Sequence, residues 1–259
     1  PLEKGGLNGS LITIDTTTYD VTCAGIVANG VTGVKLSDVT VDGAGYGAVL
    51  AKNGSFSTTI ENSRFINNRK DGLVIHGLGA SGAFTCDLQG STFTNNTGAG
   101  VKVLAKNYDT AAIDAANCKA DNNLDGGILM SAYTTVGNAT ITLSDVQAKY
   151  NYGYYSGVFA DAYSDNGNAT ITMSDVTAND NYGFVGGVFA EAYSYYGNAA
   201  VTMSGVTAND NYSYHGTAGV SARASVDGDY AYGNASITMS DVTANDNHGY
   251  CAAGVYAEA

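Results

Sequence analysis

One block of sequence recurs four times in the second half of this chain, and this repeat constrains the fold more than any other feature. The block reads GNATITLSDVQAKYNYG from Gly137, and close copies begin at Gly167, Gly197 and Gly233. The copies start 30, 30 and 36 residues apart. A fixed period of about 20 to 50 residues is typical of solenoids, in which each repeat forms one unit and stacks on the next.

An asparagine keeps the same position in each unit through the diverged first half of the chain. The seven anchors are Asn68, Asn96, Asn123, Asn151, Asn181, Asn211 and Asn247, and Ala44 stands at the matching position of an earlier unit. The chain is therefore predicted to hold about eight units of 24–36 residues. We expect a lead segment over 1–19, one solenoid domain over 20–259, and near-identical repeats over 137–259, the last of them incomplete.

Each unit contains three short runs in which apolar and polar residues alternate. A period of two predicts strands with one buried face, and the Gly, Asn and Asp residues between the runs predict turns. One unit cannot bury a core alone, so we expect parallel pairing between units and inward columns of side chains. The predicted columns are Ile141, Ile171, Val201 and Ile237, and Val146, Val176, Val206 and Val242. Counting from the anchors places Cys86 in the first column and Cys118 in the second, as buried free thiols.

This pattern resembles the right-handed parallel β-helix of pectin-lyase-like proteins over residues 20–259. The anchor asparagines are similar to the asparagine ladder of that family, in which side-chain amides bond one another about 4.8 Å apart along the stack. The resemblance implies an all-β right-handed parallel β-helix with three short strands per rung. Enzymes, adhesins and tailspikes share this repeat, so the resemblance does not define an activity.

The resemblance implies that catalytic residues, if present, lie on the outward side of the first strand, beside a polysaccharide groove. Asp87 and Asp114, about one rung apart, are the best carboxylate pair there. The arginines Arg64, Arg69 and Arg223 are expected away from that groove, and the three histidines are scattered over different rungs. The Gly-His-Gly, Asp-Asp and Trp-Ile-Asp-His-like signatures of the family's enzymes are missing. We therefore predict a non-catalytic protein without a cofactor.

Charge and hydropathy limit the partners. The chain carries 24 acidic against 11 basic residues, a net charge of -13, which argues against nucleic acid or an anionic membrane. No apolar run is long enough to span a membrane, so no insertion is expected. The near-identical repeats indicate selection for length and surface rather than for a unique site. We expect an extracellular or cell-surface protein.

Two sets of polar residues are candidate sites. Asp180, Asp210 and Asp246 form a column in which like charges repel by up to roughly 1 kcal/mol in water. Ca²⁺ would relieve this repulsion, although the spacing matches neither an EF-hand nor a nonapeptide repeat and solvent would also suffice. Asn138, Asn168 and Asn234 lie in recurrent Asn-Ala-Thr/Ser sequons and are candidates for glycosylation.

Three further surface features are expected. Thr142, Thr172, Thr202 and Thr238 form a file similar to those of ice-binding solenoids, although threonine is also a favoured strand residue. Tyrosines crowd two places and suit sugar stacking, partner contact or cover for the backbone. The first group, after the ladder, is Tyr152, Tyr154, Tyr155, Tyr182, Tyr212, Tyr214 and Tyr250. The second, expected in loops after the third strand, is Tyr163, Tyr193, Tyr195, Tyr196, Tyr230 and Tyr232.

An apolar stripe is predicted at the first outward position of the third strand. Its members are Leu50, Val74, Leu129, Phe159, Phe189 and Tyr256, interrupted by Lys102 and Ser221. Such a stripe exceeds what a monomer normally exposes, so we expect a second copy or a segment outside this sequence to cover it. Alternatively, the rings lie flat on the sheet.

Together these features predict a structural or adhesive β-solenoid that self-associates into a bundle or filament, or binds another surface protein. The alternative is a polysaccharide-binding protein or a polysaccharide-active protein of the lyase or hydrolase kind. Ice binding is a third, less favoured hypothesis.

Overall fold

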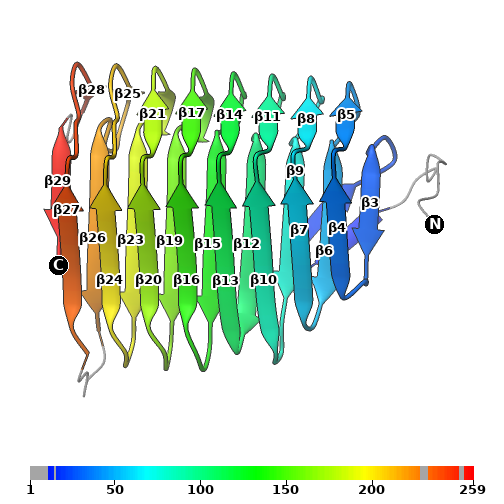
Figure 1. Ribbon diagram of the computed structural model, residues 1–259, viewed down its shortest axis with the longest axis horizontal. Coiled ribbons are helices and arrows are strands. Elements are labelled where there is room, and N and C mark those ends of the chain that lie inside the picture. Colours follow the sequence, from blue (N-terminus) through cyan, green and yellow to red (C-terminus); the bar gives the residue numbers. More distant parts are fainter. Residues whose placement is uncertain (1–10, 15, 228–232, 251–253) are drawn as a thin grey trace.

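The computed structural model describes residues 11–14, 16–227, 233–250 and 254–259. These residues form a stack of parallel strands whose rungs follow one another along the long axis (Figure 1). The described part of the chain contains strands and turns and no helix. The predicted all-β parallel solenoid is therefore confirmed.

The first strand of each rung joins an eight-stranded parallel sheet, which we call the threonine sheet. Its strands are β4 (Gly33–Ser37), β7 (Phe56–Glu61), β10 (Ala83–Gln89), β13 (Thr110–Ala116), β16 (Ala139–Ser144), β20 (Ala169–Ser174), β24 (Ala199–Ser204) and β27 (Ala235–Ser240). The second strands form the short sheet. These are β5 (Thr40–Asp42), β8 (Arg64–Ile66), β11 (Thr92–Thr94), β14 (Lys119–Asp121), β17 (Gln147–Lys149) and β21 (Thr177–Asn179).

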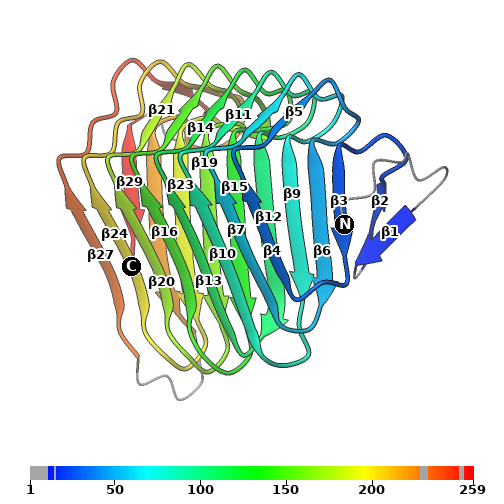
Figure 2. The ribbon, with the colours of Figure 1, turned by 45° about the vertical axis from the view of Figure 1, so that its right-hand side comes forward.

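The third strands form a nine-stranded parallel sheet. Its strands are β3 (Ile26–Asn29), β6 (Ala48–Asn53), β9 (Leu73–Leu78), β12 (Val101–Tyr108), β15 (Ile128–Thr134), β19 (Val158–Ser164), β23 (Val188–Ser194), β26 (Val220–Val226) and β29 (Val255–Glu258). Three strands per rung, as predicted, enclose the core (Figure 2).

A fourth sheet, which the sequence reasoning missed, occurs only in the near-identical repeats. It contains β18 (Tyr152–Tyr155), β22 (Tyr182–Val185), β25 (Tyr212–Ser213) and β28 (His248–Gly249). These strands lie between the ladder asparagine and the nine-stranded sheet of each rung. The period-two signal was too short to separate them from a turn. We call this the tyrosine sheet.

The predicted inward columns form the core. Ile141, Ile171, Val201 and Ile237 pair in register, and the first three are buried. Ile237 is only partly buried because it belongs to the last rung described in that sheet. Val146, Val176 and Val206 are likewise buried. Both columns are confirmed.

The cysteines follow the same columns. Cys86 pairs with Ile113, which lies in the column of Ile141. Cys86 and Cys118 are buried free thiols, as predicted. Burial raises the pKa of Cys86 to about 12 and that of Cys118 to about 11, so neither thiol is a thiolate at neutral pH. Cys23 is free and exposed, and Cys251 lies outside the described residues.

The asparagine ladder is continuous from Asn68 to Asn247. In each step the Nδ2 of one anchor donates to the Oδ1 of the next anchor over 2.8–3.0 Å. The same Oδ1 also accepts the backbone N–H of the preceding anchor. Ala44 occupies the predicted ladder position, since its N–H donates to Asn68 Oδ1 at 3.0 Å. These amides satisfy buried backbone groups at the turn.

An antiparallel hairpin of β1 (Leu11–Ile14) and β2 (Thr17–Asp20) packs its apolar side against the outer face of the nine-stranded sheet. Ile12, Ile14 and Tyr19 contact the apolar cluster that includes Val49 and Val74. The Tyr19 hydroxyl also lies 3.0 Å from Nδ1 of the buried His76. The hairpin thus covers that end of the sheet (Figure 2).

Candidate functional site

The tyrosine sheet presents two columns of aromatic side chains to solvent. Successive strand residues point to opposite faces, so the residues on either side of a buried glycine both point outward. Gly153 has a φ of +143°, and a Cβ on Gly183 would lie 2.0 Å from the Gly153 carbonyl oxygen. Glycine is therefore required between the aromatic positions of β18 and β22, whereas Ser213 takes the same position in β25. We call the outward set the tyrosine platform, and its members are Tyr152, Tyr154, Tyr182, Phe184, Tyr212 and Tyr214.

The platform rings stack from rung to rung. Ring centroids of Tyr152 and Tyr182 are 5.1 Å apart, and those of Tyr182 and Tyr212 are 4.7 Å apart, with interplanar angles of 5° and 4°. In the second column Tyr154 and Phe184 stack at 4.4 Å, whereas Tyr214 meets Phe184 edge to face, with ring centroids 6.0 Å apart and an interplanar angle of 83°. Tyr152, Tyr182 and Tyr212 nevertheless keep 53%, 41% and 43% of their surface exposed. A contiguous exposed aromatic surface of this kind is typical of binding sites rather than of a solvated sheet.

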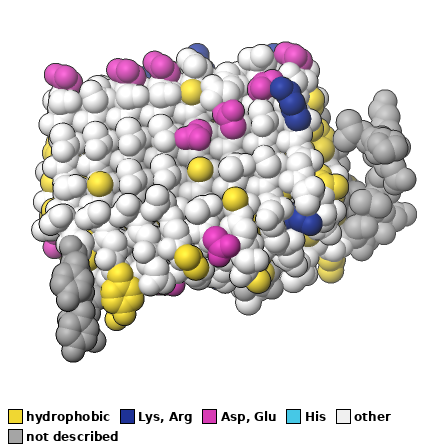
Figure 3. Space-filling view, turned by 60° about the horizontal axis from the view of Figure 1, so that its bottom comes forward, with side chains coloured by type: hydrophobic (Ala, Val, Ile, Leu, Met, Phe, Trp, Pro, Cys, Tyr) yellow, Lys and Arg dark blue, Asp and Glu magenta, His cyan; other side chains and the backbone are white. Residues whose placement is uncertain are grey.

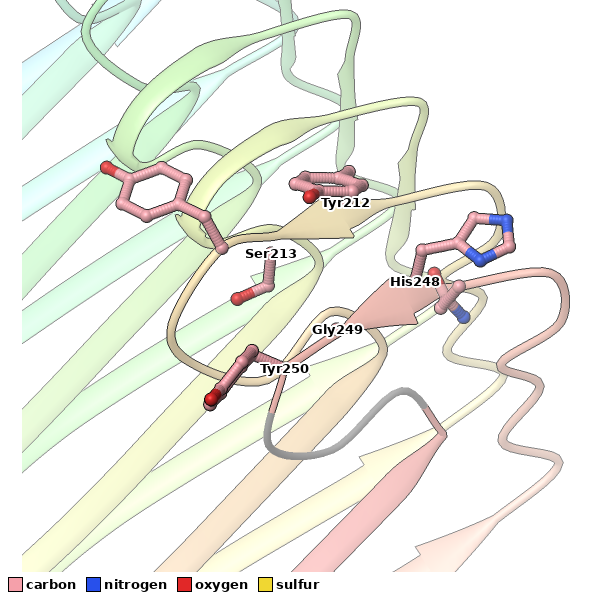
Figure 4. Close-up of a pocket in the computed structure, with 7 residues that line it drawn as sticks. Tyr212, Ser213, His248, Gly249 and Tyr250 are labelled. Atoms are coloured by element: carbon pink, nitrogen blue, oxygen red, sulfur yellow. The ribbon is translucent and has the colours of Figure 1, made fainter.

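The platform ends in a hollow of about 360 Å³ at the last rungs. Ser213 and Gly249 lie between Tyr212 and His248 on one side and Tyr250 on the other (Figure 4). His248 continues the Tyr212 column, since the two residues pair in register. The hollow is therefore the end of the platform rather than a separate site.

A second aromatic arrangement lies on the outer face of the nine-stranded sheet. Phe159 and Phe189 stack at 5.3 Å, and Tyr163 and Tyr193 stack at 5.1 Å. The strand position between these two columns is acidic, because it holds Asp161 in β19 and Glu191 in β23, which pair in register. We call this arrangement the acid slot, and its residues are Tyr133, Tyr155, Phe159, Asp161, Tyr163, Phe189, Glu191 and Tyr193.

The surroundings of Asp161 disfavour the charged form of its carboxyl group. Burial raises its pKa to about 6, the hydrogen bond from the Tyr133 hydroxyl opposes the shift, and the charge of Glu191 adds to it. The Tyr155 ring packs against Phe159, with the two ring centroids 4.0 Å apart. The Phe159 and Phe189 column belongs to the predicted apolar stripe, but the second column was not anticipated because Tyr163 and Tyr193 were expected in loops. They lie within β19 and β23.

The carboxylate pair that was predicted on the first strand is also brought together. Asp87 and Asp114 pair in register on the outer face of the threonine sheet. Gln89 Nε2 donates to Asp87 Oδ1 at 2.7 Å. Figure 3 shows this face as regular rows of mostly uncharged side chains with few acids among them. The file Thr142, Thr172, Thr202 and Thr238 is in register, as expected.

The predicted apolar stripe is not continuous in the structure, and the prediction that Leu50 belongs to it was wrong. Leu50 points into the core, and Val49 pairs with Val74 on the outer face instead. Val49 and Leu50 are both apolar, so the period-two pattern did not distinguish them. Val74 is buried beneath the hairpin. The remaining members lie on the outer face and are half-buried: Leu129, Phe159, Phe189 and Tyr256.

The aspartate column lies in turns. Asp180, Asp210 and Asp246 are exposed and have φ values of 51–56°, the left-handed region that aspartate and asparagine tolerate best after glycine. The turn conformation by itself accounts for these residues. Within the described ranges no group of three or more His, Cys, Asp or Glu residues could hold a metal ion.

The sequon asparagines Asn138, Asn168 and Asn234, together with Asn198, form a second amide stack near the surface. The backbone N–H of Asn168 donates to Asn138 Oδ1, and that of Asn198 donates to Asn168 Oδ1, each at 2.9 Å. Asn234 N–H donates in the same way to Asn198 Oδ1. Asn138 and Asn234 are exposed and Asn168 is half-buried. These side chains therefore connect neighbouring rungs.

Stacked parallel rungs, a buried asparagine ladder and outward aromatic columns define a repeat protein of the β-solenoid class. A family model described as a right handed beta helix region matches residues 24–193, and the chain belongs to this family. The fold is thus the right-handed parallel β-helix that the resemblance to pectin-lyase-like proteins implied. No curated protein and no solved structure matches the chain significantly. No helix among the described residues is long and apolar enough to cross a membrane.

Proposed function

We propose that this protein is a non-catalytic adhesive β-solenoid of the cell exterior, which binds a neutral polysaccharide on its tyrosine platform. The observation that carries the proposal is the platform itself, two aromatic columns that repeat once per rung and stay about half exposed. A monomer gains no folding stability from apolar surface that it leaves in water. Exposed rings maintained over three rungs therefore favour a ligand.

The chemistry of the platform suits sugars. Aromatic rings offer apolar faces for the C–H side of a pyranose, and phenol hydroxyls offer hydrogen bonds at the rim. The site is periodic and linear, which matches a polymer with a regular repeat better than a compact ligand. A polymer that contacts several rungs gains avidity from each additional contact.

Charge favours a neutral polymer over an acidic one. Asp180 and Asp210 are exposed two residues before the platform tyrosines Tyr182 and Tyr212. The chain as a whole has a net charge of -13. An anionic polysaccharide would be repelled from this surface, and more strongly at low salt.

Self-association of the apolar stripe has less support. The protein's own hairpin covers Val74, and Tyr155 and Arg223 lie over Phe159 and Phe189 respectively. Association between copies would therefore use only the part of the stripe beyond the hairpin.

The test is binding to a panel of neutral and acidic polysaccharides by affinity electrophoresis and calorimetry. We expect binding to at least one neutral polymer, and Tyr182→Ala with Tyr212→Ala should weaken it at least tenfold. Thr172→Ala with Thr202→Ala is the matched control, because it changes the same two rungs on the threonine sheet. Binding that survives loss of the tyrosines, or binding of acidic polymers only, would contradict the proposal.

A further inference from the structure

We infer that the stacked tyrosines Tyr133, Tyr163 and Tyr193 are an oxidative cross-linking site, at which hydrogen peroxide, acting through a haem peroxidase, joins neighbouring rungs by dityrosine bonds. We call these three residues the phenol column. The column lies on the nine-stranded sheet, so the inference neither uses the tyrosine platform nor depends on polysaccharide binding. It rests on the stacking of the three rings, on a carboxylate partner for each phenol, and on the exposure of the column.

The rings of the phenol column follow one another from rung to rung. Tyr133 pairs in register with Tyr163, and Tyr163 pairs in register with Tyr193. Their ring centroids lie 5.8 Å and 5.1 Å apart, with interplanar angles of 27° and 3°. Two phenoxyl radicals formed on neighbouring rungs are therefore held side by side, and their coupling does not depend on a chance encounter.

The stacking also decides which part of each ring is free to react. Rings that stack along the solenoid axis turn their faces to one another and leave their edges unstacked. The reactive positions of a phenol, its oxygen and the two carbons ortho to it, all lie on the edge. Tyr133, Tyr163 and Tyr193 are half-buried, so an oxidant reaches the column from solvent.

Each phenol of the column has a carboxylate partner. The Tyr133 hydroxyl donates to Asp161 Oδ2, and the Tyr163 hydroxyl donates to Asp165 Oδ1 at 2.8 Å. Tyr193 is hydrogen-bonded to the side chain of Asp227 in the same way. A base must lie within hydrogen-bond reach of the proton that it takes, and these three carboxylates do so.

The protonation states fit an electron loss that is coupled to a proton transfer. Burial and the hydrogen bond to Asp165 raise the pKa of Tyr163 to about 12. Burial and the neighbouring carboxylates also raise the pKa of Tyr133 and of Tyr193, so all three phenols are protonated at neutral pH. A phenol that loses an electron becomes strongly acidic, and its proton then passes to the carboxylate. Asp161, with its pKa raised to about 6 by burial, is a stronger base than an ordinary aspartate.

The cross-linking step balances with one peroxide for each bond. The oxidant removes one electron from each of two neighbouring tyrosines, and the carboxylates take the two phenolic protons. A carbon–carbon bond forms between one ortho carbon of each ring, and the two ortho hydrogens move to the oxygens, which restores both phenols. The two electrons and the two protons reduce one hydrogen peroxide to two waters.

A second column on the same strands shows that packing does not require the hydroxyl groups. Phe159 and Phe189 stack at 5.3 Å with an interplanar angle of 5°, which is nearly the geometry of Tyr163 and Tyr193. Rings without a hydroxyl therefore stack equally well in β19 and β23. The phenols and their carboxylates thus favour a chemical role for the other column.

The experiment treats the full chain, at a concentration low enough to limit links between copies, with hydrogen peroxide and a haem peroxidase at pH 7. The monomeric product is isolated and digested, and mass spectrometry identifies peptide pairs joined with the loss of two hydrogens. We expect links between Tyr163 and its neighbours Tyr133 and Tyr193. Because the readout is the identity of the joined pair, reaction at the tyrosine platform does not interfere. Tyr163→Phe keeps the stacked ring and should abolish both links.

The proton acceptor is tested with Asp165→Asn, which keeps every phenol of the column. We expect the yield of the link between Tyr163 and Tyr193 to fall by about threefold or more. Asp180→Asn is the matched control, because it makes the same change of charge in a turn beside the tyrosine platform, and it should leave that yield unchanged. Absence of any link within the column of the unmodified chain, or equal yields in Asp165→Asn and Asp180→Asn, would overturn the inference.

Discussion

The two halves of the solenoid use aromatic residues in opposite ways. In the diverged half the largest buried side chains include Phe56, Phe65, Phe84, Phe93 and Tyr108. In the near-identical half, residues 137–250, the buried apolar side chains are aliphatic and the described rings lie on or near the surface. Both halves nevertheless continue the same sheets (Figure 1).

This difference shows that stacked repeats can build a core from small side chains. From β16 to β24 one inward column is Ala throughout, and the other two exchange only Ile for Val and Leu for Met, so each layer fits the next without large rings. In the diverged half, by contrast, Phe65 and Phe93 stack inside the core at 5.7 Å. The aromatic residues of the near-identical half are thus available for a surface role.

The largest expected effect tests the aliphatic columns. Val176→Asp places a charge in a column with no partner, and we expect loss of the folded state, a cost of more than about 4 kcal/mol. Thr177→Asp, at the next and outward position of the same rung, should change stability by less than about 1 kcal/mol. Circular dichroism with urea unfolding measures both. Similar stability of the two variants would show that the column does not face the core.

The second prediction compares the same truncation inside and outside. Phe65→Ala removes a buried ring and should cost about 3–5 kcal/mol. Tyr182→Ala removes a platform ring that is 41% exposed and should cost about 1 kcal/mol or less, the worth of a stacked pair. Urea denaturation measures the free energy of unfolding of both variants. An equal loss in both would mean that the platform rings stabilise the fold, which would weaken the case for a binding role.

Sequence reasoning predicted the three strands, the inward columns and the ladder because each depends on a residue repeated at fixed spacing. It did not predict β18 or β22, since four residues with a central glycine carry too little periodicity. Leu50 was misplaced because Val49 beside it is equally apolar. The acid slot was missed because it depends on register between β15, β19 and β23, with Tyr133, Tyr163 and Tyr193 as strand residues.

A smaller effect concerns the acid slot and depends on pH. The folded state raises the pKa of Asp161 from 3.8 to about 6, so the folded protein keeps a proton that the unfolded chain has already lost between these values. Stability therefore falls as pH rises through this window, by about 3 kcal/mol. The groups that face Asp161 are Tyr133, Tyr155 and Glu191.

Asp161→Asn should remove this cost. We expect the variant to be more stable than the unmodified chain by about 3 kcal/mol at pH 7 and about equal to it near pH 3, where Asp161 is mostly protonated in both the folded and the unfolded chain. Thermal unfolding across that pH range measures the difference. Asp165→Asn, on the turn after the same strand, serves as the control. A destabilised Asp161→Asn variant at pH 7 would contradict the slot electrostatics described above.

The central claim is that the near-identical half displays its tyrosines to hold a polymer, and footprinting of those rings tests it most directly. The full chain is nitrated at tyrosine with and without a bound neutral polysaccharide, and each site is quantified by mass spectrometry. We predict that the polymer protects Tyr152, Tyr182 and Tyr212, while Tyr163 and Tyr193 on the other face react as before. Unchanged reactivity of the platform tyrosines, or protection confined to Tyr163 and Tyr193, would contradict the claim.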